Sequence, residues 1–88
     1  MKYQVIYSKR AVKELKKLDK SQSKLLISWI EKNLKNTENP RKHGKNLKGV
    51  LNEYWRYRVG KYRIISIIDD NKIIINIISV GHRSNIYK

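Results

Sequence analysis

The chain has no cysteine among its 88 residues. Disulfide frameworks, thiolate zinc sites and cysteine nucleophiles are therefore excluded, and a reducing compartment such as the cytoplasm is expected. Long apolar runs are absent too, because the longest stretches, 64–68 and 73–80, fall far short of the roughly 18 residues that a membrane-spanning helix needs. No signal-peptide pattern opens the chain. We expect residues 1–88 to form a single soluble, unprocessed cytoplasmic domain with no membrane partner.

Acidic residues are scarce, since 7 Asp and Glu stand against 21 Lys and Arg and leave a formal net charge of +14. Self-repulsion at this charge destabilises the compact state, so an anionic partner is the simplest reason for keeping so many cations. Nucleic acid is the first candidate and an acidic protein is the second. A membrane surface fits less well, because no segment pairs a basic face with a broad Trp and Leu face. The remaining alternative is a solvated basic surface.

The first half of the chain predicts one strand followed by a helical hairpin. Residues 1–7 alternate in polarity, which is the period of a half-buried strand. Apolar residues then recur at helical spacing from 9 to about 19, after a possible N-cap at Ser8. A second apolar stripe runs from about 21, with Ser21 as its possible N-cap, to about 36. We expect the two helices to pack antiparallel.

The second half predicts a loop followed by strands. Residues 37–48 lack apolar periodicity and form a loop long enough to be functional, closed by Leu47 docking on the core. Strands are expected over 53–59, 62–69 and 73–80, with two-residue turns at Gly60-Lys61 and Asp70-Asn71. The order is therefore β-α-α-β-β-β, an α+β fold in which both helices cover one face of an antiparallel sheet.

The turn at Gly60-Lys61 sorts the side chains of the two strands beside it. With this turn Arg58 faces Arg63, and facing residues share one side of the sheet. One side then carries an apolar set that two helices would cover: Trp55, Tyr57, Val59, Tyr62, Ile64, Ser66 and Ile68. The opposite side carries Tyr54, Arg56, Arg58 and Arg63, continuing into Ile65 and Ile67. A register slip of one residue would exchange the two sides.

Three arginines on one side of a sheet need an explanation beyond solubility, because like charges opposed across strands are destabilising. Arginine keeps its charge and presents a fork of donors that matches phosphate oxygens, so the cluster predicts a phosphate-binding site. Tyr54 beside it would stack on a base. The alternative is that the arginines spread over a solvated face and pair with Glu53 or Asp69.

The segment after the last strand is expected to complete this site. Gly81 lets the backbone turn. Antiparallel pairing places Val80 near Lys61, so the tail would emerge close to Arg63. Five side chains would then gather at one end of the sheet: Arg58, Arg63, His82, Arg83 and Tyr87. A lone histidine carries a weak functional signal, and His43, in the loop, carries less than His82.

The chemistry open to such a set is limited. The sequence shows no Asp, Glu and His spacing typical of a metal site, no glycine-rich phosphate loop and no Ser-His-Asp set, so we expect no metal and no cofactor. A cationic site with a His and a Tyr suits attack of an RNA 2′-OH on its own adjacent phosphate. There the protein orients the nucleophile, neutralises the charge that grows on the phosphorane and assists proton transfer. DNA has no 2′-OH and would not react in this way.

Several short motifs together resemble the RelE branch of the RelE/ParE toxin superfamily. They are residues 57–64 (YRVGKYRI), 78–83 (ISVGHR) and 86–87 (IY), with 46–49 (NLKG) before the second predicted strand. The resemblance spans the chain and implies a RelE-like microbial RNase fold. It implies the toxin of a type II toxin-antitoxin system that enters the A site of the 70S ribosome, beside 16S rRNA, and cleaves mRNA without metal. It also implies a cognate acidic antitoxin, with operator DNA contacted only through that antitoxin.

The resemblance also implies roles for individual residues. Arg56 and Arg58 match strand cations that hold the phosphate and are candidates for proton transfer, and Arg63 matches an arginine that stabilises the transition state. Arg83 matches an arginine at the scissile phosphate or leaving group, and Tyr87 matches a terminal tyrosine that orients or stacks on a base.

Other positions depart from the family pattern or vary within it. Arg56 and Arg58 stand where many relatives have lysine, and a guanidinium is a poor general base, so the base remains open. His82 is an acid or base candidate at a variable position. Lys45 and Lys48 are candidate rRNA or mRNA contacts, with solvated loop lysines as the plain alternative.

Two other functions remain open. The ParE branch of the same superfamily poisons DNA gyrase. A non-catalytic basic protein that binds RNA or the ribosome would also explain the charge and the arginine cluster.

Overall fold

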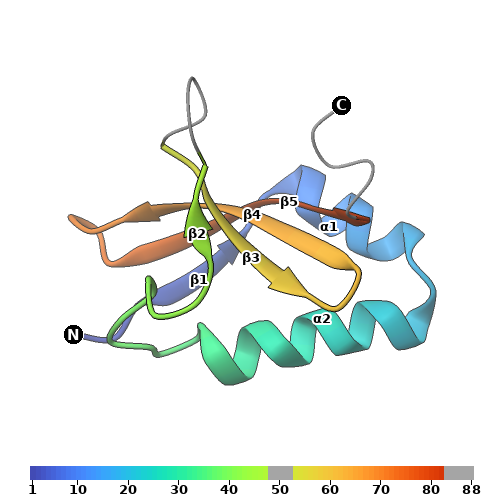
Figure 1. The fold of residues 1–88 in the computed structure, drawn as a ribbon, viewed down its shortest axis with the longest axis horizontal. Helices are drawn as coiled ribbons and strands as arrows, with labels where there is room; N and C mark the ends of the chain where they lie inside the picture. Colours follow the sequence, from blue (N-terminus) through green and yellow to red (C-terminus); the bar gives the residue numbers. More distant parts are fainter. Residues whose placement is uncertain (48–52, 83–88) are drawn as a thin grey trace.

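The computed structural model describes residues 1–47 and 53–82 (Figure 1). Two helices pack on a five-stranded sheet, which confirms the α+β class. The elements are β1 (Gln4–Tyr7), α1 (Lys9–Lys17), α2 (Lys20–Asn33), β2 (Lys45–Asn46), β3 (Trp55–Val59), β4 (Tyr62–Asp69) and β5 (Ile74–His82). None of the helices in the described residues is long and apolar enough to cross a membrane.

Helix α1 begins where the sequence predicts. The Ser8 hydroxyl oxygen accepts a hydrogen bond from the Ala11 N–H at 3.0 Å, so Ser8 is the N-cap. The same hydroxyl donates to the Ile78 carbonyl at 2.8 Å. One side chain therefore both caps α1 and fastens its first turn to β5.

Helix α2 begins earlier and ends earlier than predicted. Its N-cap is Asp19 rather than Ser21, and the Ser21 hydroxyl donates to the Asp19 carboxylate at 2.7 Å. The helix ends at Asn33, and the chain then turns through Asn36 in the left-handed region at φ 64°. The Asn36 N–H donates to the Tyr3 carbonyl at 2.9 Å, which joins the turn to the start of β1. Stopping the helix here lets the chain return to the sheet.

The sheet has the strand order β1-β5-β4-β3-β2 and is mixed. The predicted antiparallel arrangement holds for β3, β4 and β5. Strand β1, however, pairs parallel to β5, with Gln4 beside Ile74 and Tyr7 beside Ile77. Parallel neighbours need a long crossover, and here α1, α2 and the first strands of the meander supply it. The two-residue strand β2 lies within the predicted loop 37–48.

The β3–β4 hairpin has the predicted register, whereas β5 is shifted. The loop between β4 and β5 spans residues 70–73 instead of two residues, and an irregularity at Ile65/Ser66 adds a bulge. Val80 therefore faces Ile64 rather than Lys61. Gly81 does not turn the chain, because it lies within β5 opposite Arg63.

One face of the sheet and the two helices enclose the core. The buried cluster is Ala11, Leu15, Leu26, Ile30, Leu34, Tyr57, Val59, Ile64, Ile75, Ile77 and Val80. Trp55 and Tyr62 pack against it, as the predicted face assignment requires. Leu47 is buried as expected. The sorting of side chains by the Gly60-Lys61 turn is thus confirmed, and the alternative slipped register is wrong.

Candidate functional site

Arg56, Arg58 and Arg63 lie on the sheet face opposite the buried cluster. Arg58 is directly across from Arg63 in the β3–β4 register, and Arg56 is across from Ile65. Arg58 is exposed, while Arg56 and Arg63 are half-buried. The hairpin therefore brings the three predicted cations together on one face.

A cleft of about 340 Å³ opens beside these strands. Its lining residues come from α2, from the segment around β2 and from β3: Trp29, His43, Gly44, Lys45, Arg56 and Arg58. Among the described residues, β2 pairs with Trp55 and Arg56 of β3, and Arg58, beyond this pairing, also lines the cleft. Within the part of the chain that the structure describes, the lining set combines three cations with two aromatic rings and includes no carboxylate.

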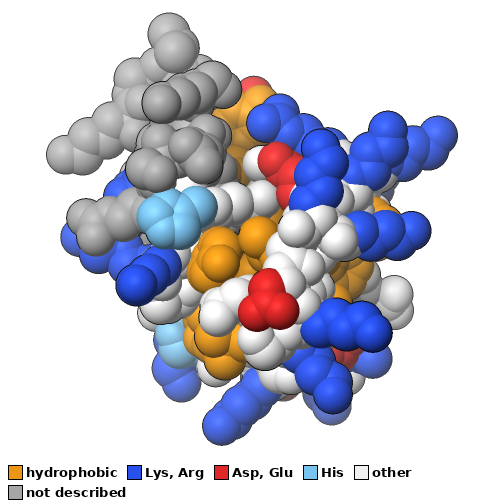
Figure 2. Space-filling model, turned by 90° about the vertical axis from the view of Figure 1, so that its right-hand side faces the viewer, with side chains coloured by type: hydrophobic (Ala, Val, Ile, Leu, Met, Phe, Trp, Pro, Cys, Tyr) orange, Lys and Arg blue, Asp and Glu red, His pale blue; other side chains and the backbone are white. Residues whose placement is uncertain are grey.

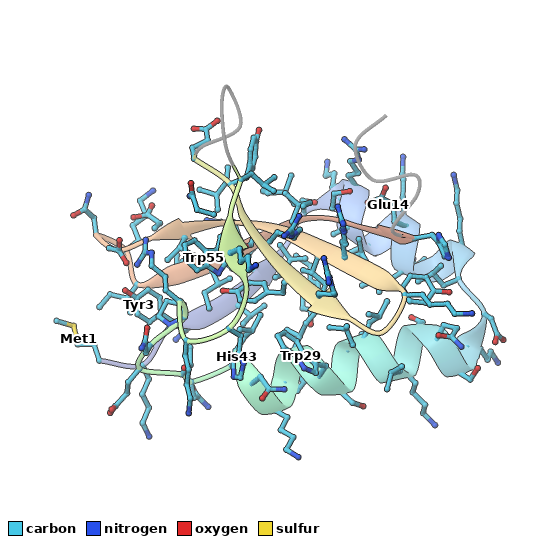
Figure 3. All side chains as sticks on the ribbon, in the orientation of Figure 1. Met1, Tyr3, Glu14, Trp29, His43 and Trp55 are labelled. Carbon is cyan, nitrogen blue, oxygen red and sulfur yellow. The ribbon has the colours of Figure 1, made fainter. Side chains whose placement is uncertain are left out.

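Aromatic rings form one wall of this cleft. The Trp29 ring lies 5.7 Å from the His43 ring in an edge-on arrangement and 5.6 Å from the Tyr57 ring. Figure 3 shows Trp29 and His43 side by side near the end of α2, with Trp55 close to them. The Tyr57 hydroxyl donates to the Pro40 carbonyl at 2.7 Å, and burial raises the pKa of Tyr57. Tyr57 thus stays a neutral donor that anchors the loop to β3.

Gly44 lets the loop approach β3 closely. Its φ is +83°, and a Cβ at this position would lie 2.2 Å from the Arg56 carbonyl oxygen. The neighbouring His43 carbonyl accepts a hydrogen bond from the Trp55 indole N–H at 2.7 Å. Only glycine fits such an approach at this φ, so the cleft wall has one backbone conformation.

The surface of the protein is strongly basic. Figure 2 shows Lys and Arg side chains around much of one face, with an apolar patch between them and few acidic groups. At this net charge the cleft cations add to a positive field that attracts anions. Guanidinium groups at the cleft wall are suited to phosphate oxygens, and the aromatic wall is suited to stacking.

One arginine outside the cleft is neutralised by an acid. The Arg41 guanidinium donates to both oxygens of Asp70, at 3.0 and 2.9 Å, and the Tyr3 hydroxyl donates to the same carboxylate at 2.6 Å. The Arg41 hydrogen bonds, followed by that from Tyr3, lower the pKa of Asp70. Asp69, proposed as a partner for the strand arginines, accepts backbone N–H bonds from Asn71 and Lys72 instead.

The remaining predicted site residues are dispersed. Lys45 is exposed and lines the cleft. Tyr54 precedes β3, and its carbonyl accepts from the Leu47 N–H at 3.1 Å, but the residue is not among those that line the cleft. Lys48, Arg83 and Tyr87 lie outside the described residues.

His82 is not where the sequence analysis expects it. It stands opposite Tyr62, and the two rings lie 5.8 Å apart, edge-on. This places His82 on the Tyr62 side of the sheet, whereas Arg63 belongs to the other side. The shifted β4–β5 register is the cause, because an odd shift moves every later residue of β5 to the opposite side.

Two cleft residues were not among the predicted site residues, and the sequence analysis ranked His43 below His82. Trp29 reads as part of the apolar stripe of α2, and His43 lies in a loop without periodicity. A signal was nevertheless present, since His43 directly precedes a glycine in a loop that closes on an aromatic strand.

Within residues 1–47 and 53–82, no group of three or more His, Asp or Glu side chains is placed to hold a metal ion.

Comparison with known proteins identifies the family. The model of a family described as the ParE toxin of the type II toxin-antitoxin system parDE matches residues 5–87. A RelE-like toxin protein of Escherichia coli is 31% identical over 90 residues, which cover 99% of this chain and 92% of the relative. The chain belongs to the RelE/ParE toxin superfamily. It is therefore a toxin of the type II toxin-antitoxin class.

Solved structures of this superfamily share the fold. The toxin-antitoxin complex RelBE2 of Mycobacterium tuberculosis contains a chain that matches with a TM-score of 0.85 and 27% identity, covering 97% of this toxin and 95% of that chain. A chain of the archaeal RelE-RelB complex of Pyrococcus horikoshii matches with a TM-score of 0.71 and 26% identity, covering 97% and 99%. The two helices and the mixed sheet are therefore those of RelE structures.

Proposed function

We propose that this toxin is a metal-independent endoribonuclease that cleaves mRNA in the ribosomal A site and so inhibits translation. The observation that carries the proposal is the gathering of Arg56, Arg58 and Arg63 on one sheet face, two of them lining a cleft. These cations supply fixed positive charge at the place where a phosphorane would develop negative charge. RNA brings its own nucleophile, the 2′-OH, so the site must mainly position and neutralise.

Roles follow from position. Arg56 and Arg58 hold the phosphate at the cleft wall, and Arg63, across from Arg58, stabilises the transition state. Arg83 and Tyr87 keep the roles that the family resemblance implies, at the leaving group and at the base. Lys45 contacts the RNA backbone from the loop side of the cleft.

The partner in the resting cell is an acidic antitoxin. Solved relatives are toxin-antitoxin complexes, and a net charge of +14 favours an acidic protein that covers the cations. Operator DNA is contacted only through that antitoxin, and the toxin acts in the cytoplasm.

The test is primer-extension mapping of an mRNA on programmed ribosomes, with the same mRNA free in solution beside it. We expect ribosome-dependent cuts in the A-site codon, reduced about 100-fold or more by Arg63→Ala, as for loss of one donor to a developing anion. Arg10→Ala is the matched control, because it removes one exposed arginine from α1, away from the cleft. A folded Arg63→Ala variant that cuts like the wild type would contradict the assigned site.

A second candidate function is favoured by the family model, whose description is a ParE toxin. Under this alternative the chain poisons DNA gyrase. A supercoiling assay with purified gyrase separates the two candidates. Growth inhibition with gyrase arrest and no mRNA cuts would replace the nuclease proposal. Binding of RNA without either activity would identify a non-catalytic RNA-binding protein.

A further inference from the structure

The cleft holds a histidine with a hydrogen bond at its backbone carbonyl and an aromatic contact at its ring. The His43 carbonyl accepts from the Trp55 indole at 2.7 Å, and the His43 ring lies edge-on to Trp29 at 5.7 Å. The next residue, Gly44, approaches β3 so closely that no Cβ fits there. A loop residue on a solvated surface would not need such fixation. The half-buried imidazole is instead held in the same cleft as Arg56 and Arg58.

The arginines leave one requirement of the proposed reaction unmet. Attack by a 2′-OH needs a group that removes its proton, and a guanidinium keeps its own proton at neutral pH. Imidazole is the side-chain group best suited to exchange a proton near neutral pH. Among the described residues that line the cleft, His43 is the one whose side chain has a nitrogen able to accept a proton.

We propose that the His43 imidazole accepts the 2′-OH proton during RNA cleavage, an inference that rests on the proposed endoribonuclease function. The 2′ oxygen forms a bond to the adjacent phosphorus, and its proton moves to an unprotonated ring nitrogen of His43. The bond from phosphorus to the 5′ oxygen breaks, and that oxygen takes a proton from water. The products are a 2′,3′-cyclic phosphate and a 5′-OH, and His43 returns its proton to the solvent.

The other histidine provides a contrast. His82 is exposed and lies against Tyr62 at the end of β5. It does not line the cleft. The two histidines of the chain are thus matched in chemistry and different in position, which makes each the control for the other.

The test compares His43→Phe with His82→Phe in the single-turnover cleavage assay on programmed ribosomes. Phenylalanine keeps an aromatic edge against Trp29 but has no proton acceptor. We expect His43→Phe to lower the single-turnover rate constant by about 10²- to 10⁴-fold, the usual range for loss of an acid or base, with little change in the half-saturating toxin concentration. His82→Phe should cleave at the wild-type rate. If His43→Phe does not fold, His43→Gln takes its place.

Two further readouts separate proton transfer from packing. The wild-type rate should rise with pH as an imidazole loses its proton, and this rise should be missing in His43→Phe. The charged groups among the described cleft residues are Arg56 and Arg58 from β3 and Lys45 from β2, and α2 contributes the neutral Trp29. Added imidazole should restore cleavage to His43→Gly.

The outcomes distinguish the two proposals. Cleavage by the wild type together with an unimpaired His43→Phe variant would overturn the role of His43 and leave the nuclease function standing. A lowered rate with an unchanged pH profile and no rescue by imidazole would also overturn it, because His43 would then act through packing. Absence of wild-type cleavage under every condition would overturn the nuclease function and the role of His43 together.

Discussion

Two parts of the molecule use arginine in opposite ways. Near the β4–β5 loop, Arg41 forms a two-point ion pair with Asp70, and its guanidinium also lies 5.9 Å from the Trp55 ring. At the cleft, Arg56 and Arg58 stand among lining residues that, in the described part of the chain, include no carboxylate. The first arrangement neutralises an arginine within the fold, and the second places two arginines beside a cleft. Position relative to the few acids of the chain, rather than residue type, therefore separates a structural arginine from a candidate phosphate ligand.

The largest loss of stability is expected when Tyr57, whose ring supports the cleft, is replaced. Tyr57 is fully buried, contacts Trp29 and bonds the Pro40 carbonyl, so Tyr57→Ala should lower the free energy of unfolding by about 3–5 kcal/mol. Tyr57→Phe keeps the ring but leaves the Pro40 carbonyl without its donor, at a loss of about 1–3 kcal/mol. Urea denaturation measures both. Equal losses in the two variants would show that the hydroxyl, not the ring, supports the cleft.

A smaller loss of stability is expected when Gly44, where the loop meets β3, is replaced. Gly44→Ala combines a positive φ with a Cβ 2.2 Å from the Arg56 carbonyl, so it should destabilise the fold by about 1–3 kcal/mol and displace the cleft wall. Gly60→Ala is the matched control, because its φ is +58° but nothing lies within 4 Å of a Cβ there. Gly60→Ala therefore measures the cost of the positive φ without a steric clash. Thermal melts that rank Gly60→Ala as the worse of the two would refute the close approach of loop and strand.

The smallest loss of stability is expected when the ion pair between Arg41 and Asp70 is removed. Asp70→Asn should lower stability at neutral pH by only about 0.2–1 kcal/mol, because the ion pair is exposed. The folded-state pKa of Asp70 is lowered, so its contribution is fully present above the usual carboxyl pKa and is lost as the pH falls through the lowered one. Wild type and variant should therefore converge in acid. A gap that widens as the pH falls would reverse the assigned direction.

Local patterns predicted much of this fold, because the governing interactions are close in sequence. The two-residue turn at Gly60-Lys61 determines that Arg58 faces Arg63, and the structure has this pairing. The Ser8 cap is local in the same way. The cluster of strand arginines was predicted for this reason.

What was missed depends on contacts between distant segments. The parallel pairing of β1 with β5 is decided by which sheet edge stays free after the meander has formed. The position of His82 depends on a longer loop and a bulge that together shift β5 by an odd number of residues. His43 lines the cleft because Gly44 lets the loop approach β3 closely. No periodic pattern in the sequence predicts this approach.

The parallel pairing also governs the order in which the chain can be completed. Strand β1 is synthesised long before its partner β5, and the Ser8 bond to Ile78 spans 70 residues. Contacts this distant in sequence slow folding, because the entropy cost of closing the loop comes before the strands gain any hydrogen bonds. A nascent chain that lacks β5 leaves β1 without its neighbour and α1 without its anchor. Strands β2, β3 and β4 are therefore all synthesised before β1 gains its neighbour.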